Sequence, residues 1–417
     1  MSIYSALVSV VWIVFLVSVV YYYMLLLIRH RKPRQTKQFK SITVIIPAHN
    51  EECYIADTLH AVLEAEFKGK KQIVVVDDGS TDRTADIVKR FKQVRLIRTK
   101  HSGKSSSLNT ALKVAKGELI AVVDADSVIE YDSLRKLAVE VGRENTAAAC
   151  CVVKVNNRKK LLCMWQHIEQ LYSSLIRHLS SKINANVVTP GPLSVYRAEL
   201  LKKLGGFSTE GYCEDIDVTI KLIRSGYRIG FVDDTASHAN QPYKLKEFLR
   251  QRYRGSRGLL NILKRHFEIK PSLLNLTTMP LLLFSYVQAV VMGSLTLYQM
   301  VSGYFAYFLS QGQIFNLYVL RFFFDWFSLI GFFKWTVSVF TGSAPWTLAA
   351  SVGIAATLLT YPLYIFAIFK YNRKFDIWHI VPVLFMFPYW LFMMLLYIIS
   401  IPSLFTAKQH NIWKKNE

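Results

Sequence analysis

The sequence predicts an α/β fold, in which a doubly wound, mostly parallel sheet lies between hydrophobic helical segments that cross a membrane. Residues 3–28 carry no charged side chain, and residues 272–406 are mostly apolar. Between them, residues 41–268 have the composition of a soluble domain, with apolar runs that alternate with helical patterns. About 20 apolar residues are enough for a helix to cross a bilayer, so both ends are expected to be membrane segments.

The first element, residues 1–28, is expected to be one transmembrane helix. No basic residue precedes it and it is longer than the apolar part of a signal peptide, so cleavage is not expected. Six Lys and Arg residues follow in the linker 29–40. Basic residues tend to stay on the cytoplasmic side. The N-terminus is therefore predicted outside, and the next domain in the cytoplasm, of a multi-pass plasma-membrane protein.

The domain 41–246 contains the strands of the predicted sheet. Strand-like runs lie within ITVIIPAHNEE, QIVVVDDGS, VRLIRTK and ELIAVVDADS, and a helical pattern follows each of them. Nearly continuous Val and Ile is typical of strands that helices cover on both faces. Polar residues end each run, at the edge where sheets of this kind bind ligands. A ligand site is therefore predicted at the carboxyl ends of the strands.

Asp124 and Asp126 follow the last of these strands as D-x-D. Side chains two residues apart share a face of a strand, so the two carboxylates are expected to repel each other unless a cation lies between them. A Mg²⁺ ion that also binds substrate phosphates is the usual solution. The alternative is that both aspartates only stabilise a turn or the start of a helix.

The formal net charge of +22 could attract nucleic acid, lipid headgroups or an anionic substrate. No nucleic-acid-binding module is recognisable, so nucleic acid is not expected as a partner. Most of the charge is assigned to the lipid bilayer beside the membrane helices. None of the five cysteines has the spacing of a zinc site, and reduced structural thiols are expected.

The segment HSGKSSSL contains the end of a P-loop. Arg98 stands where that loop needs a glycine, so ATP hydrolysis is not expected. Lys104 could reach the diphosphate of a substrate, or it could be an exposed lysine at the start of a helix.

Seven motifs, in chain order, resemble those of family 2 glycosyltransferases: PAHNEE, VVDDGSTDRT, GKSSSLNTAL, DADS, GPLSVYR, CEDIDVTIKL and QRYRG. The chain resembles the membrane-embedded synthases of poly-N-acetylglucosamine, hyaluronan and chitin oligosaccharides, including their hydrophobic flanks. The resemblance implies a glycosyltransferase A-type domain in the cytoplasm, an inverting transfer and a UDP-sugar donor. It also implies Mg²⁺ or Mn²⁺ as cofactor.

The resemblance implies a role for each site residue. Residues for the nucleotide sugar are Pro47, His49, Glu51, Asp77, Asp78, Lys104, Asp124, Gln251 and Arg254. Asp126 and Asp124 are expected to hold the metal, and Asp215 and Glu214 to be catalytic, with Asp215 as the general base. Gly191, Pro192 and Glu214 are expected near the acceptor, although Pro-Gly-Pro could also be a plain structural turn.

Chemistry supports a base at Asp215 independently. Displacing UDP from a sugar requires stabilisation of the leaving diphosphate and a group that takes the acceptor proton. EDIDVTIKLIRSG predicts a helix with Asp215 in its first turn, where the helix dipole favours the ionised carboxylate. Glu214 and Asp215 could alternatively only stabilise the helix start.

Residues 247–270 predict an amphipathic helix at the membrane interface. The synthase pattern is Q-x-x-R-W, and this chain has Gln251 and Arg254 but Gly255 in place of tryptophan. Glycine gives no platform on which an acceptor sugar can stack, so the motif does not indicate whether elongation is processive. The arginines of this segment could also form a basic membrane-surface helix.

The C-terminal region 271–406 contains four apolar stretches, at about 274–308, 314–340, 345–369 and 378–404. The second contains Arg321, Asp325 and Lys334 and could span, re-enter or lie at the interface. Four crossings would place the tail 407–417 in the cytoplasm, but would place the basic loop 370–376 outside. The number of crossings is left open, and prolines at 382, 388 and 402 are expected to break the last stretch.

Three functions are compatible with these features. The first is a processive synthase that uses UDP-N-acetylglucosamine to make, and extrude, a β-linked polysaccharide. The second is transfer of single sugars to a lipid carrier or a short glycan, which Gly255 favours. The third is a channel or scaffold with an inactive transferase domain, which the intact acidic motifs oppose.

Overall fold

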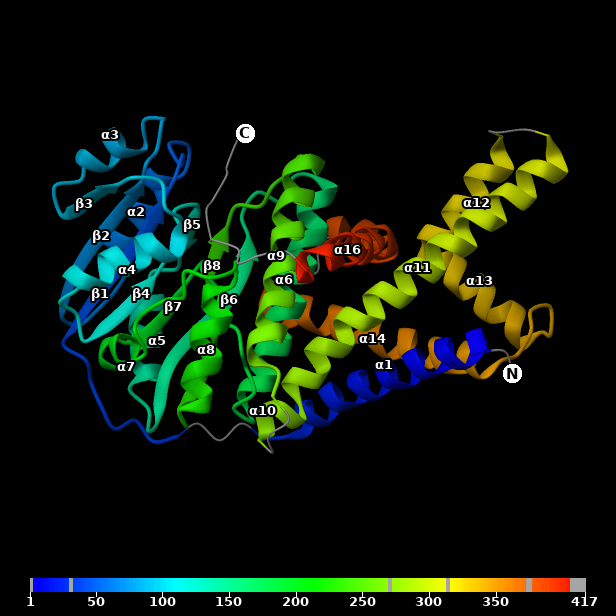
Figure 1. Ribbon diagram of the computed structural model, residues 1–417, viewed down its shortest axis with the longest axis horizontal. Helices are drawn as coiled ribbons and strands as arrows, with labels where there is room; N and C mark the ends of the chain where they lie inside the picture. Colours follow the sequence, from blue (N-terminus) through cyan, green and yellow to red (C-terminus); the bar gives the residue numbers. More distant parts are fainter. Residues whose placement is uncertain (1–2, 30–32, 269–271, 313–315, 373–376, 406–417) are drawn as a thin grey trace.

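The computed structural model describes residues 3–29, 33–268, 272–312, 316–372 and 377–405. A strongly twisted sheet with helices forms one half of the described chain, and long helices extend from it on the other side (Figure 1). The predicted fold class is confirmed, because the sheet is mixed but mostly parallel and apolar helices lie at both ends of the chain. The predicted tail 407–417 lies outside the described residues.

The sheet of the described chain has eight strands in the order β3-β2-β1-β4-β7-β6-β8-β5. Their bounds are β1 (Ser41–Ala48), β2 (Lys70–Asp78), β3 (Val94–Thr99), β4 (Leu119–Val122), β5 (Ser127–Ile129), β6 (Thr146–Val155), β7 (Ser194–Arg197) and β8 (Arg228–Ala239). The first four are parallel, as are β6 and β8, whereas β7 and β5 are antiparallel to their neighbours. β1 therefore has β2 on one side and β4 on the other.

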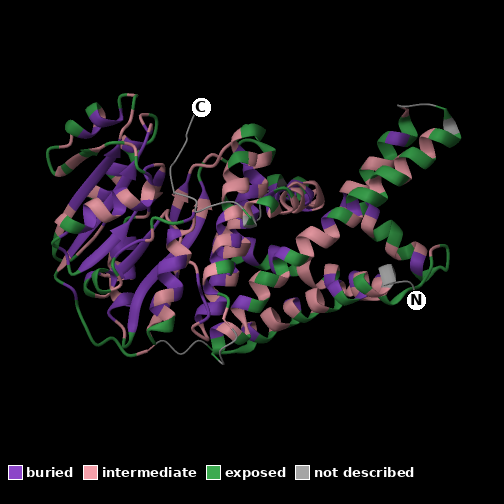
Figure 2. Cartoon of the chain, in the orientation of Figure 1, coloured by how far each residue is buried: buried purple, intermediate pink, exposed green. Residues whose placement is uncertain are grey.

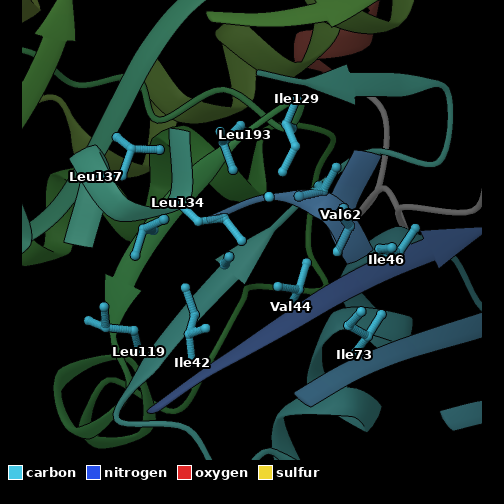
Figure 3. Close-up of a cluster of buried hydrophobic side chains, with 14 of the residues drawn as sticks. Ile42, Val44, Ile46, Val62, Ile73, Leu119, Ile129, Leu134, Leu137 and Leu193 are labelled. Atoms are coloured by element: carbon cyan, nitrogen blue, oxygen red, sulfur yellow. The ribbon is translucent and has the colours of Figure 1, made fainter. Parts of the chain in front are cut away.

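Helices cover both faces of the sheet. They are α2 (Ile55–Glu64), α3 (Thr84–Lys89), α4 (Lys104–Val114), α5 (Ser133–Val141), α6 (Leu161–Ser181), α7 (Ala198–Lys203), α8 (Glu214–Arg224) and α9 (Leu245–His266). Successive residues of β1 face opposite layers, because side chains alternate along a strand. Val44 and Ile46 pack with α2 and α5 (Figure 3), whereas Ile45 packs with Leu108 of α4.

The apolar helices are α1 (Ile3–Leu27), α10 (Leu273–Leu276), α11 (Thr278–Gln311), α12 (Leu317–Phe327), α13 (Leu329–Phe340), α14 (Leu348–Asn372), α15 (Ile380–Leu384) and α16 (Met386–Ser400), with 3-10 turns at Ile377–His379 and Ile401–Leu404. One buried cluster joins Val152 of β6 and Leu175 of α6 to Ile368 of α14 and Tyr389 of α16. Figure 2 shows that burial continues from the sheet into the nearest helices, whereas α11 and α12 are largely exposed farther out. α6 thus lies between the sheet and the apolar helices and packs against both.

Four described segments are long and apolar enough to cross a bilayer, and they are Ala6–Leu27, Leu273–Ser310, Leu348–Asn372 and Met386–Ser403. The 34 residues of α11 extend about 51 Å at 1.5 Å per residue. The hydrocarbon core of a bilayer is only about 30 Å thick. α11 must therefore be tilted in a membrane or project beyond it.

The predicted stretch 314–340 is not one continuous helix. It is divided into α12 and α13 at Ser328, whose hydroxyl accepts a hydrogen bond from Gly331 N–H and caps the second helix. Each part has 11 or 12 residues, too few to cross a bilayer alone. Across the break, Lys334 Nζ lies 2.6 Å from Asp325 Oδ1, so the charges in this stretch pair with each other.

The last apolar stretch is broken by proline, as predicted. α15 ends at Leu384 and α16 begins at Met386. A proline ring clashes with the carbonyl four residues before it, and for Pro388 that carbonyl belongs to Leu384. Only the part from Met386 onward is long enough to span.

Lys182 ties the N-terminal helix to the sheet domain. Its Nζ donates hydrogen bonds to the carbonyls of Leu25 and Ile28, each at 2.9 Å, and of Leu26 at 3.3 Å. The last carbonyls of a helix have no partner within the helix, and a cation near them also interacts favourably with the helix dipole. Lys182 therefore acts as the C-terminal cap of α1.

Candidate active site

The carboxyl ends of β1, β2 and β4 meet at one edge of the sheet, because the three strands are parallel neighbours. The strand order reverses here, which is where open sheets of this type bind ligands. His49 follows β1, Asp78 ends β2 and Asp124 follows β4. The fold therefore brings these residues to the edge at which the sequence predicts a ligand site.

The ammonium group of Lys104 pairs with two carboxylates at this edge of the sheet. Its Nζ lies 2.7 Å from Asp124 Oδ1 and 3.3 Å from Glu214 Oε1, and its side chain is only 10% exposed. Burial lowers the pKa of Lys104, but the negative charges of Asp124 and Glu214 hold the pKa well above its ordinary value. A buried ammonium group is tolerated when it is paired in this way. One side chain thus connects the start of α4, the loop after β4 and the start of α8.

Gly191 allows the chain to lie directly against this ion pair. A Cβ atom added at Gly191 would be 2.5 Å from both Lys104 Nζ and Asp124 Oδ2. The Gly191 carbonyl accepts a hydrogen bond from Asp124 N–H at 3.1 Å, and Ser237 Oγ donates to the Pro192 carbonyl at 3.0 Å. The predicted acceptor residues Gly191 and Pro192 therefore lie in a fixed turn beside Lys104 and Asp124.

Asp215 lies in the first turn of α8, immediately after Glu214. A small cavity is lined by both carboxylates together with Lys104, Gly191 and Tyr196. Burial, followed by the negative charge of Glu214, raises the pKa of Asp215 to about 7. A carboxyl group whose pKa is close to the working pH is well suited to accept a proton from a substrate.

A buried hydroxyl network holds the backbone of Asp215. Thr219 Oγ1 donates to the Asp215 carbonyl at 2.6 Å, and Thr189 Oγ1 lies 2.6 Å from Thr219 Oγ1 and 2.7 Å from Tyr196 Oη. All three hydroxyl-bearing residues are buried. Sequence reasoning does not identify them, because single threonines and tyrosines in such segments give no distinctive pattern.

The carboxylates of Asp77 and Asp78 accept hydrogen bonds from the loops around them. Asp78 binds the N–H groups of Ser102 and Gly103, both at 2.8 Å, and Asp77 binds Ser80 N–H at 3.0 Å. Asp77 is fully buried and Asp78 is 3% exposed. In this structure the two residues shape the connections that follow β2 and β3, at the edge where nucleoside binding is predicted.

His49 and His101 form a stacked pair at the same edge. Their ring centroids are 4.1 Å apart and their planes differ by 21°. Nδ1 of each ring lies close to the Asp78 carbonyl, at 2.8 Å for His49 and 3.1 Å for His101. Sequence reasoning identifies His49 but not His101. The signal for His101 is its place on the β3–α4 connection, three residues before Lys104.

Pro47 and Glu51 flank His49 in the chain. Pro47 lies within β1, in register with Val76 of β2. Glu51 is 2% exposed, and its N–H donates to Thr84 Oγ1 at 2.8 Å. Both predicted residues are thus buried at the end of β1 and the start of the connection to α2.

Asp126 lies one residue before β5. Its carbonyl accepts hydrogen bonds from Asn240, and Ser127 Oγ donates to its Oδ1 at 3.3 Å. Among the described residues, no three His, Cys, Asp or Glu side chains form a metal cage. Mg²⁺ commonly takes only one or two carboxylates and completes its shell with substrate phosphates and water. The hard oxygen donors of Asp124 and Asp126 therefore fit a metal that binds together with a diphosphate.

α9 packs along the segment that leads into α8. A Cβ atom added at Gly258 would overlap Cys213 Sγ, and one added at Gly211 would be 2.8 Å from Asn261 Oδ1. The Arg257 guanidinium lies 5.5 Å from the centre of the Tyr212 ring. This close approach brings one face of α9 against the chain immediately before Glu214.

Gln251 and Arg254 lie on the same face of α9 as Gly258, because residues three, four and seven apart share a helix face. Gln251 Oε1 is buried, and within the described chain it has no hydrogen-bond donor. A buried carbonyl oxygen without a partner is costly. The predicted residues Gln251 and Arg254 therefore face the same region as Cys213, and Gln251 has an acceptor available for a ligand.

Gly255 is exposed on α9, and no atom lies within 4 Å of a Cβ atom added there. Gly255→Ala is expected to increase the free energy of unfolding by about 0.5–1 kcal/mol, because glycine loses more backbone entropy in a helix than alanine does. Thermal unfolding of the detergent-solubilised protein should show a higher Tm. Gly258→Ala is the matched control on the same helix, and should lower Tm because its methyl group meets Cys213. A lower Tm for Gly255→Ala would contradict the open space at this position.

Residues 43–205 match the model of glycosyl transferase family 2. The chain therefore carries a domain of this family, as the motif order predicts.

Among known proteins, the chain is 32% identical over 251 residues to the probable glycosyltransferase YdaM of Bacillus subtilis, covering 56% of this chain and 60% of that protein. It is 28% identical over 276 residues to the poly-beta-1,6-N-acetyl-D-glucosamine synthase of Staphylococcus aureus, covering 63% and 66%. The matches thus span less than two thirds of either relative.

A solved structure shares the fold over nearly the whole chain. The mannosyltransferase PcManGT of Pyrobaculum calidifontis, in complex with GDP-Man and Mn²⁺, superposes with a TM-score of 0.60 at 19% identity. The likeness covers 95% of this chain and 99% of that one. The fold of this chain is therefore found in a known glycosyltransferase.

Proposed function

We propose that the chain is a membrane-bound, inverting glycosyltransferase that takes its sugar from a nucleotide diphosphate donor. The observation that carries the proposal is that Lys104, Glu214 and Asp215 line one small cavity at the carboxyl edge of the sheet, while Asp124 pairs with Lys104 beside it. A buried cation suited to a diphosphate lies there beside a carboxyl group suited to accept a proton. The expected donor is UDP-N-acetylglucosamine, which the similarity to a poly-N-acetylglucosamine synthase supports.

The reaction follows from the roles of these groups. Asp215 takes the proton of an acceptor hydroxyl as its oxygen attacks the anomeric carbon, and the bond from that carbon to the diphosphate breaks. The attack from the opposite side inverts the anomeric configuration. Lys104 stabilises the negative charge that develops on the leaving diphosphate. Gln251 and Arg254 face the same region, and an arginine fork is well suited to phosphate.

Asp126 and Asp124 are the residues that would hold Mg²⁺ or Mn²⁺. A bound divalent ion supplies further stabilisation of negative charge on the diphosphate. The Mn²⁺ and GDP-Man in the complex of PcManGT support the use of a divalent ion and a nucleotide sugar by this fold.

The product is proposed to be a β-linked polysaccharide that the apolar helices help to extrude. A second candidate is the transfer of single sugars to a lipid carrier or short glycan. Gly255 favours this alternative, because the synthase pattern has a tryptophan there, on which an acceptor sugar could stack. In either case the four apolar segments are proposed to place the chain in the plasma membrane as a multi-pass protein, with the sheet domain in the cytoplasm.

Activity with defined donors tests the proposal. The full chain, purified in detergent or nanodiscs, is incubated with Mn²⁺ or Mg²⁺ and labelled UDP-sugars, and the release of UDP is measured. UDP-N-acetylglucosamine should give the highest rate, and chelation by EDTA or the change Asp126→Ala should reduce it by more than about tenfold. A labelled product that grows in length indicates the polysaccharide, and one labelled lipid indicates the second candidate. No UDP above the Asp126→Ala level from any donor would overturn the proposal.

A further inference from the structure

Three helices from distant parts of the chain meet at the carboxylate of Glu169. Glu169 lies on α6, and its Oε1 accepts a hydrogen bond from Arg252 Nη1 of α9 at 3.0 Å. Its Oε2 accepts hydrogen bonds from Arg252 Nη2 and from Tyr389 Oη of α16, the latter at 2.6 Å. α16 packs against both α6 and α9, and all three helices lie close together in Figure 1.

Arg252 points away from the face of α9 that approaches the candidate site. Successive helix residues are turned by about 100°, so Arg252 lies about 160° from Arg254. α9 is therefore held on two sides, by Glu169 on one and by the contact between Gly258 and Cys213 on the other. A helix held on both sides can neither rotate nor slide without breaking one of these contacts.

The contact between Glu169 and Arg252 fixes the orientation of α9 more than it stabilises the fold. The side chains of Glu169 and Arg252 are 11% and 16% exposed. A buried ion pair adds little net stability, because both charges lose their hydration. The two-pronged pairing of a guanidinium with a carboxylate does, however, fix distance and orientation. Tyr389 is fully buried, and its hydroxyl donates a third hydrogen bond to the Glu169 carboxylate, which further fixes the orientation of that side chain.

We propose that Glu169 is a positioning residue, which through Arg252 sets the place of Gln251 and Arg254 at the donor diphosphate, and which through Tyr389 makes that place depend on the apolar helix α16. This inference rests on the proposed function. It gives α16 a part in the transfer reaction although the helix contributes no residue to the cavity described above.

Donor kinetics provide the first test. Glu169→Gln and Tyr389→Phe are each expected to raise KM for the UDP-sugar, by about 10-fold to 100-fold for Glu169→Gln, because a displacement of about 1 Å has effects of this size. kcat should change less than KM. Glu140→Gln is the matched control, because Glu140 is also buried and pairs with Arg143 at 2.7 Å away from α9. Equal KM values in Glu169→Gln and Glu140→Gln would overturn the proposal.

A double variant separates positioning from stability. Glu169→Met with Arg252→Met removes both charges, so it should recover most of the Tm lost in Glu169→Gln. KM should nevertheless remain raised, because no directional contact orients α9. A return of KM to the wild-type value together with Tm would show that the ion pair has only a structural role.

A cross-link test does not depend on activity. A Cβ atom added at Gly258 would lie 3.6 Å from Cys213 Cβ, within the range of disulfides. In a Gly258→Cys protein, the rate of disulfide formation with Cys213, followed by mass spectrometry under mild oxidation, reports how α9 lies against this segment. Glu169→Gln should slow it several-fold and Glu140→Gln should not. Equal rates would contradict positioning even if no donor is ever found, and unequal rates without UDP release would leave positioning in place while the proposed function fails.

Discussion

Asp215→Asn is expected to lower kcat for sugar transfer by about 10²-fold to 10⁴-fold, the usual contribution of a general base. Asparagine preserves the size and the hydrogen bond from Ile216 N–H, which lies 2.9 Å from Asp215 Oδ1, but it cannot take a proton. KM for the donor should change only a few-fold. Initial rates of UDP release with saturating acceptor measure both quantities.

Asp217→Asn is the control on the same helix. Asp217 is buried and paired with Lys221 at 2.7 Å and His266 at 2.8 Å, so its loss should lower Tm. kcat should fall far less than in Asp215→Asn. Equal losses of kcat in the two variants would indicate that α8 is merely disturbed, and would contradict a base at Asp215.

The pH dependence of the wild type should report the same group. Burial and the charge of Glu214 raise the pKa of Asp215 to about 7, and only the ionised carboxylate accepts a proton. kcat/KM should therefore level off above pH 7 and fall about tenfold for each pH unit below it. Asp215→Asn should lack this limb. A wild-type profile that is flat between about pH 5.5 and 7.5 would contradict the assignment.

Gly191→Val is the second change with a large expected effect. Its side chain would begin 2.5 Å from Lys104 Nζ and from Asp124 Oδ2, so the ion pair must move. A displacement of about 1 Å in a catalytic group costs about 10²-fold, and kcat/KM for the donor should fall by at least that factor. Steady-state rates together with Tm measure the effect.

Gly303→Ala serves as the control for this substitution. A Cβ atom at Gly303 makes only ordinary contact, 3.5 Å from Phe322 on α12, so activity should be retained. If Gly191→Val keeps wild-type kcat/KM, the turn beside Lys104 cannot be part of the active site.

The sequence predicts β1, β2 and β4 well, because each contains an apolar run that helices cover on both sides. β4, for example, is buried at all four positions. β5 and β7 have only three and four residues, and their antiparallel pairing depends on partners far along the chain. Periodicity within a short segment cannot reveal such partners.

The ion pairs of the candidate site are also only partly predictable. D-x-D and the Glu-Asp pair at the start of α8 mark where carboxylates lie, and G-K-S marks a lysine near them. Nothing local shows that Lys104 bridges Asp124 and Glu214, since the contact joins three separate connections. Asp77 and Asp78 illustrate the reverse case, because their motif is clear while their hydrogen bonds to the following loops emerge only from the fold.

The cap that Lys182 provides for α1 has a consequence for biogenesis. α1 leaves the ribosome before Lys182, because the ammonium group that satisfies its last carbonyls lies 157 residues after Leu25. Until that residue has been made, only solvent can satisfy these carbonyls. The contact between α1 and the sheet domain is therefore completed late in synthesis, and a chain truncated before residue 182 would keep the packing of α1 on α6 but lack this cap.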